Sequence, residues 1–125
     1  MALSLEAGSW SGLLRAAARG LLEAGGLESR PRGRRRTADV DLRGGSREEL
    51  LVDWVNELIF RAWTEGWAPM DVRFAPSGAR RIRAGLRGPR LRPGDLSSEV
   101  KAASYHGLRV SRRGGRWAAT LILDV

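Results

Sequence analysis

Residues 46–66 read SREELLVDWVNELIFRAWTEG, and this stretch decides the fold of the chain. Ser46 and Glu49 have the spacing of a capping box, in which the Ser hydroxyl accepts from the Glu49 N–H and the Glu carboxylate accepts from the Ser46 N–H. Gly66 is well placed to end a helix of about 18 residues. The apolar stripe of this helix, which we expect in the core, consists of Leu50, Leu51, Trp54, Val55, Leu58, Ile59 and Ala62.

The segment before this helix predicts a strand, a second helix and another strand. Apolar and polar residues alternate over Leu3–Ala7 and again over Thr37–Leu42, as in strands with one buried face. Ser9 or Ser11 can cap a helix that runs to about Glu23. The apolar face of that helix, which we expect to be buried, contains Leu13, Leu14, Ala17, Ala18, Leu21 and Leu22.

After Gly66 the hydrophobic period changes from helical spacing to two, which is typical of strands. The expected strands are Trp67–Phe74, Arg80–Leu86, Glu99–Tyr105, Gly107–Ser111 and Arg116–Asp124, with a hairpin turn at Gly114-Gly115. We therefore predict a single α+β domain over residues 1–125. It has a mostly antiparallel twisted sheet with the two helices packed on one face.

The chain is strongly basic, with 22 Lys and Arg against 14 Asp and Glu and a formal charge of +8. All but one of the basic residues are Arg, and they gather in two stretches, Arg30–Arg36 and Arg80–Arg92. Such stretches fit either a solvated surface in an Arg-rich protein or contact with nucleic-acid phosphates.

Several function classes find no support in the sequence. There is no Cys for a disulfide framework or a thiolate metal site, and no apolar run approaches the length of a membrane span. The common hydrolase, metalloprotease and nucleotide-loop motifs are missing, and groups for acid/base catalysis are scarce. These features predict a cytoplasmic protein without autonomous catalysis.

Two places carry unusual chemistry. The only Lys, Tyr and His, which are Lys101, Tyr105 and His106, fall within nine residues, EVKAASYHG. At the other place, the Asp124 carboxylate and the terminal carboxylate of Val125 could bind Ca²⁺ or Mg²⁺ if another acid lies near. From the residues alone, a structural Tyr-His pair and a solvated terminus remain open alternatives.

Three segments, in order, resemble motifs of the archease family. LLVDWVNEL at 50–58 is similar to the family's LLxDWLNEL helix, EVKAASYHGL at 99–108 to its EVKAVTYHGL segment, and LILDV at 121–125 to its ILD[IV] terminus. The resemblance implies a small α+β protein that is a non-enzymatic activator of an RtcB-type RNA ligase. It would promote guanylylation and turnover of the ligase in tRNA splicing or RNA repair.

The resemblance also implies roles for single residues. Asp124 and Val125 match family residues that help to hold a divalent cation, and Lys101 matches the Lys linked to ligase activation. We expect Lys101, Tyr105 and His106 to act together in partner recognition or activation. The family's third metal ligand is the Asp of an HTAD motif before the first helix. Asp39 lies in a similar TAD sequence but follows that helix. We therefore align the family's Asp with Ala2, which predicts weak cation binding, and expect either an upstream Asp or a member that lacks it.

A second hypothesis is based on the two basic stretches. The chain could be an RNA-binding module unconnected with a ligase, whose Arg30–Arg36 and Arg80–Arg92 segments contact phosphates. Retention of an RNA ligase after nuclease treatment would separate the two hypotheses.

Overall fold

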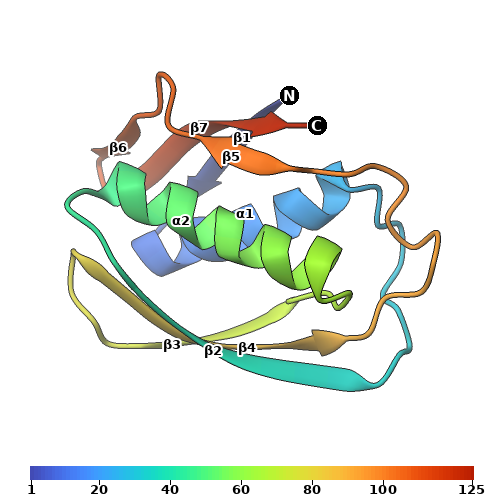
Figure 1. Ribbon diagram of the computed structural model, residues 1–125. Helices are drawn as coiled ribbons and strands as arrows, with labels where there is room; N and C mark the ends of the chain where they lie inside the picture. The colour runs from blue at the N-terminus through green and yellow to red at the C-terminus, as the bar shows by residue number, and fades with distance from the viewer.

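The computed structural model describes residues 1–125 and has two antiparallel sheets with a layer of helices between them (Figure 1). The elements in chain order are β1 (Ala2–Ala7), α1 (Trp10–Ala24), β2 (Arg35–Arg43), α2 (Arg47–Ile59), the π-helical turn η1 (Phe60–Thr64), β3 (Asp71–Ala75), β4 (Arg81–Pro89), β5 (Ala102–Ser104), β6 (Val110–Arg113) and β7 (Arg116–Asp124). The α+β class, the antiparallel strands and the two helices are confirmed. The prediction of a single sheet is wrong, because the strands form two sheets and each sheet covers one side of the helices.

The first sheet, sheet A, is built around β7. β1 pairs with one edge of β7, and β5 and β6 share the other edge, β5 beside Ile122–Asp124 and β6 beside Arg116–Ala119. The N-terminal amine donates to the Leu123 carbonyl at 3.1 Å, so both termini lie side by side at one end of this sheet (Figure 1). The second sheet, sheet B, has the order β2-β4-β3.

The core lies where the helices meet the inner faces of both sheets. All the residues expected in the two helix stripes are buried, and seven of them, Leu13, Ala17, Leu21, Leu51, Trp54, Val55 and Leu58, are fully buried. The Trp54 indole N–H donates to the Leu14 carbonyl at 3.0 Å and so ties the two helices together. Helix α2 buries a broad set of apolar positions, which one sheet on one side cannot cover, and this explains the second sheet.

The cap of α2 differs from the expected capping box in one bond. The Ser46 Oγ accepts from the Glu49 N–H at 3.1 Å, as predicted. The Glu49 carboxylate, however, accepts from the Gly45 N–H at 2.5 Å instead of the Ser46 N–H. A Cβ atom on Gly45 would lie 3.1 Å from the Glu49 Oε2, so the glycine allows this close approach.

The second helix ends earlier as an α-helix than Gly66 suggests. The α-helical part stops at Ile59 and continues as η1, before Gly66 turns the chain with a φ of +76°. Arg61, in η1, forms ion pairs with Glu57 in α2 at 2.5 Å and with Glu65 directly after η1 at 2.8 Å, and so connects the two helical segments. Neither helix combines the length and the apolar composition that a membrane span requires.

The strands of the second half are placed as expected but differ in length. Of the expected strand Trp67–Phe74, only the end lies in β3, and Trp67 makes an isolated bridge to Arg90. β5 is likewise only three residues long. The predicted hairpin at Gly114-Gly115 is confirmed: both glycines have positive φ, and Arg113 pairs with Arg116.

Candidate functional site

The segment that contains Lys101 lies beside the C-terminus. The Lys101 N–H donates to the Asp124 carbonyl at 2.7 Å, and β5 continues the pairing with β7 directly after it. The side chains of Lys101, Asp124 and Val125 are all exposed. The structure therefore gathers the Lys and the two C-terminal carboxylates at one end of sheet A.

Tyr105 and His106 occupy the opposite end of β5, on a turn. The Leu108 N–H donates to the Tyr105 carbonyl at 3.0 Å, and Gly107 has a φ of +67°. Leu108 is buried and anchors the turn, whereas Tyr105 is 51% exposed and His106 is exposed. Lys101 and Tyr105 are four residues apart on an extended chain, which separates their Cα atoms by about 13 Å. The three side chains thus line one edge rather than converge on one point.

Helix α2 holds this edge through three polar side chains. The Asn56 Oδ1 accepts from the Ala103 N–H at 2.8 Å, and the Glu48 Oε2 accepts from the Val110 N–H at 3.0 Å. The Asp53 Oδ1 accepts from the Tyr105 hydroxyl at 3.2 Å. The helix motif and the EVKAASYHGL segment are therefore one structural unit.

Sequence reasoning missed these three positioning residues. The available signal was the position of Asp53 and Asn56, three residues apart and so on the same side of the helix, next to a wide apolar stripe. Which backbone they would reach could not be read from the helix alone.

The environment of Tyr105 favours its neutral phenol. Desolvation raises the pKa of Tyr105 above its ordinary value, and the charge of Asp53, its hydrogen bond and the charge of Glu49 raise it further. The hydroxyl therefore remains a hydrogen-bond donor to Asp53 at neutral pH.

The residues expected to bind a metal do not come together as a full ligand set. Asp39 lies on β2 in sheet B, opposite Gly85, and the helical layer separates it from Asp124 in sheet A (Figure 1). No three His, Cys, Asp or Glu side chains of the structure are grouped as metal ligands. Asp124 and the Val125 carboxylate alone supply too few of the six to eight oxygens that Ca²⁺ takes.

The residue at position 2, Ala2, lies near the Asp124 and Val125 carboxylates but adds no oxygen ligand to them. Ala2 pairs with Ile122 across β1 and β7, so its side chain is on the same outer face as that of Asp124, two residues further along. A carboxylate here would lie diagonally across from Asp124, about 7–8 Å away between Cα atoms. Ala2 has no oxygen ligand to offer.

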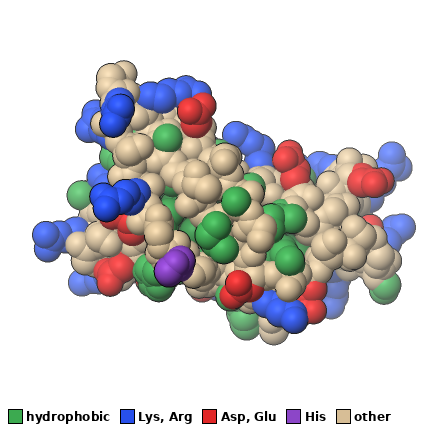
Figure 2. All heavy atoms as spheres, turned by 90° about the horizontal axis from the view of Figure 1, so that it is seen from above, with side chains coloured by type: hydrophobic (Ala, Val, Ile, Leu, Met, Phe, Trp, Pro, Cys, Tyr) green, Lys and Arg blue, Asp and Glu red, His purple; other side chains and the backbone are tan.

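Sheet A presents an outer face with little charge at its centre. Of the five large apolar side chains that stay exposed, four lie on or beside this sheet: Met1, Tyr105, Ile122 and Val125. Figure 2 looks down on this face, with hydrophobic side chains over its middle, the single His near its edge and basic side chains around the rim. Three of these side chains, Met1, Ile122 and Val125, lie at the Lys101 end of the sheet.

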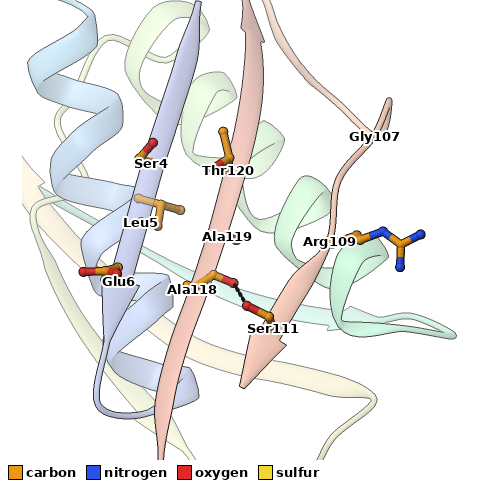
Figure 3. Close-up of a pocket in the computed structure, with 9 residues that line it drawn as sticks. All are labelled: Ser4, Leu5, Glu6, Gly107, Arg109, Ser111, Ala118, Ala119 and Thr120. Carbon is orange, nitrogen blue, oxygen red and sulfur yellow. Dashed lines mark hydrogen bonds between the residues drawn. The ribbon is translucent and has the colours of Figure 1, made fainter. Parts of the chain in front are cut away.

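The same face contains a shallow hollow between β1, β7 and β6 (Figure 3). Its volume is about 540 Å³, and its floor is made of small side chains such as Ser4, Ala118 and Thr120. The Ser111 hydroxyl donates to the Ala118 carbonyl at 3.4 Å, and the Arg109 side chain extends away from the strands.

Comparisons with known proteins agree with this arrangement. The model of the archease protein family (MTH1598/TM1083) matches residues 1–125. "Protein archease" of Methanopyrus kandleri is 32% identical over 92 residues, which are 70% of this chain and 66% of that protein. "Protein archease" of Archaeoglobus fulgidus is 30% identical over 92 residues, 72% of this chain and 67% of that protein. The matched segment thus spans about two thirds of each relative.

Solved structures show the same fold. An archease from Thermotoga maritima, described as a possible chaperone, superposes with a TM-score of 0.72 at 25% identity. The superposition covers 100% of this chain and 90% of the Thermotoga maritima chain. Methanobacterium thermoautotrophicum protein 1598 superposes with a TM-score of 0.68 at 20% identity. The superposition covers 99% of this chain and 91% of that protein. With the family model matching from the first residue to the last, this chain belongs to the archease family.

Proposed function

We propose that this protein is a non-enzymatic activator of an RtcB-type RNA ligase and promotes its guanylylation and turnover. One observation carries the proposal. Lys101, the Asp124 and Val125 carboxylates and the exposed apolar side chains of Met1 and Ile122 all lie at the same end of sheet A. A partner protein that covers this end buries apolar surface and meets the charged groups at once.

The chemistry of this end suits a role in assisting a partner's active site. The Lys ammonium is a compact charge on a flexible stem, which can reach phosphate oxygens in a neighbouring site. Its backbone is fixed by β7, while α2 fixes the following residues through Asn56 and Asp53. The flexible charge is thus presented from a rigid base, as a positioning group requires.

We further propose that any divalent cation binds this chain weakly. Asp124 and the Val125 carboxylate offer oxygen ligands, but Ala2 contributes none and Asp39 is on the other sheet. A ligand from the partner would be needed to complete the coordination shell.

The test uses the purified protein, a cognate RtcB-type ligase, GTP and an RNA with joinable ends. We expect the wild-type protein to raise the rate of ligase–guanylate formation and to give no ligation product by itself. Lys101→Ala should fold normally, because its side chain is exposed, yet lose the stimulation. Arg19→Ala removes one exposed basic side chain from α1, away from this edge, and should keep it. Full stimulation by folded Lys101→Ala would refute the assignment.

A pull-down tests the partnership separately from the Lys. After nuclease treatment, the tagged protein should retain the ligase from a mixture of the two pure proteins. Recovery of the ligase only when RNA is present would favour an RNA-binding module over a direct activator.

A further inference from the structure

The outer face of sheet B collects arginines from three strands. Alternation along the strands directs every second side chain outward, and the register places Arg73 on β3 across from Gly85 on β4. Arg83 and Arg87 flank that glycine on β4, and Arg43 lies at one end of β2. All four arginines are exposed.

Two of the acids of this face, Asp41 and Asp71, pair with other arginines, and Asp39 makes no ion pair. Arg81 contacts Asp41 through two hydrogen bonds of 2.8 and 2.6 Å, and Asp71 lies 2.8 Å from Arg30 and 3.7 Å from Arg35. Arg81 also lowers the pKa of Asp41, first through its hydrogen bond. No ion pair involves Arg43, Arg73, Arg83 or Arg87, although the charges of Arg43 and Arg83 also lower the pKa of Asp41.

Two of these arginines, Arg73 and Arg83, line a hollow, and Arg87 lies further along β4. Arg83 and Arg87 are four residues apart on one strand, or about 13 Å, and Arg73 lies one strand away at the level between them. The centre is open because Gly85 has no side chain: a Cβ there would meet only the Asp39 Oδ1, at 3.8 Å. The hollow measures about 400 Å³, and its acids, Asp39 and Asp41, are on the β2 side.

We propose that the β3–β4 half of this face binds the phosphate backbone of double-helical RNA through Arg73, Arg83 and Arg87. Guanidinium groups bind phosphate oxygens well, and three unpaired ones on a rigid sheet can each neutralise a phosphate. None of the exposed large apolar side chains lies on sheet B, so the face has neither an aromatic platform for unpaired bases nor an anchor for lipid.

The shape of the face favours an RNA helix over DNA. The minor groove of A-form RNA is wide and shallow, and it is contacted through phosphates and 2′-hydroxyls. A sheet face with the small Gly85 on its central strand, Ala75 at the end of β3 and long arginines beside them offers contacts to such a surface. Binding of this kind does not depend on base sequence.

This inference does not depend on the ligase partnership. Sheet B lies on the opposite side of the helical layer from the Lys101 end of sheet A (Figure 1), so both faces can be occupied together. The binding test needs only protein and RNA, whereas the activation test needs the ligase. Failure of one therefore leaves the other result interpretable.

The test measures fluorescence anisotropy of a labelled RNA duplex over a series of salt concentrations. In the variant with Arg73→Gln, Arg83→Gln and Arg87→Gln, affinity at low salt should fall at least about tenfold. The slope of log affinity against log salt should become shallower by about 2 to 3, since each phosphate contact contributes about 0.7 to 0.9. Circular dichroism should show an unchanged fold, because these side chains are exposed.

The control removes the same charge from the other sheet. Arg109→Gln, Arg113→Gln and Arg116→Gln lie on or near the β6–β7 hairpin, and we expect this variant to bind RNA within about twofold to threefold of wild type. Equal losses in both variants would mean that only net charge matters, and no loss in the sheet B variant would exclude this face. Tighter binding to a DNA duplex of the same sequence, or to phosphatidylcholine vesicles containing phosphatidylserine, would also overturn the proposal.

Discussion

Asn56 gives the most direct test of how α2 supports the functional edge. Its Oδ1 accepts from the Ala103 N–H at 2.8 Å, and Ala103 is only 8% exposed. Asn56→Ala leaves this partly buried donor without a partner, which costs about 1–3 kcal/mol. With an m-value of about 1.5 kcal/mol/M, the urea midpoint should fall by about 0.7–2 M.

Urea unfolding followed by Trp fluorescence measures this loss, since the chain has five Trp residues. Asn56→Asp keeps an acceptor oxygen at the same position and should lose clearly less stability. Hydrogen exchange adds a local measurement: the Ala103 amide should exchange faster in Asn56→Ala, while the Val110 amide, held by Glu48, stays protected. A wild-type midpoint together with unchanged exchange at Ala103 would refute the reasoning.

Three further changes test the cap, the tyrosine and the metal site. Ser46→Ala removes the acceptor of the α2 cap and should cost about 0.5–2 kcal/mol, seen as a lower urea midpoint; an unchanged midpoint would show that the cap contributes nothing. Tyr105, the only Tyr, should ionise above the ordinary pKa of 10.0 in a tyrosinate absorbance titration, and Asp53→Asn should lower that value. Because the folded pKa is raised, the stabilisation is present at neutral pH and is lost as the pH rises above 10; ionisation at or below the ordinary value would contradict this. Ala2→Asp adds a carboxylate beside Asp124 and should tighten Ca²⁺ binding in calorimetry by about tenfold or more, and equal affinity of the two proteins would contradict the alignment.

The sequence predicted the parts of the fold that local periodicity determines. The stripe through Leu51, Trp54 and Leu58 specifies a helix and its buried face without knowledge of the partner that covers it. The Gly114-Gly115 turn similarly specifies a hairpin, because two adjacent positive φ angles suit few other residues.

The choice of partner could not be predicted in the same way. Alternation in Thr37–Leu42 shows that one side of a strand is buried, but not that the strand pairs with β4 rather than β7. Because the pattern of a strand does not specify its pairing partner, Asp39 and Asp124 could not be assigned to different sheets from the sequence alone. The Asn56–Ala103 and Asp53–Tyr105 contacts are also non-local, which is why they appeared only in the structure.

The central place of β7 has a consequence for the order of folding. β1 must wait for a partner more than a hundred residues away, since Ala7 pairs with Trp117, whereas the three strands of sheet B lie within Arg35–Pro89. Closing the longer loop costs more chain entropy before any contact forms. We therefore expect sheet B and α2 to assemble first in refolding, and the edge that carries Lys101 to become ordered only in the final step, when β7 docks.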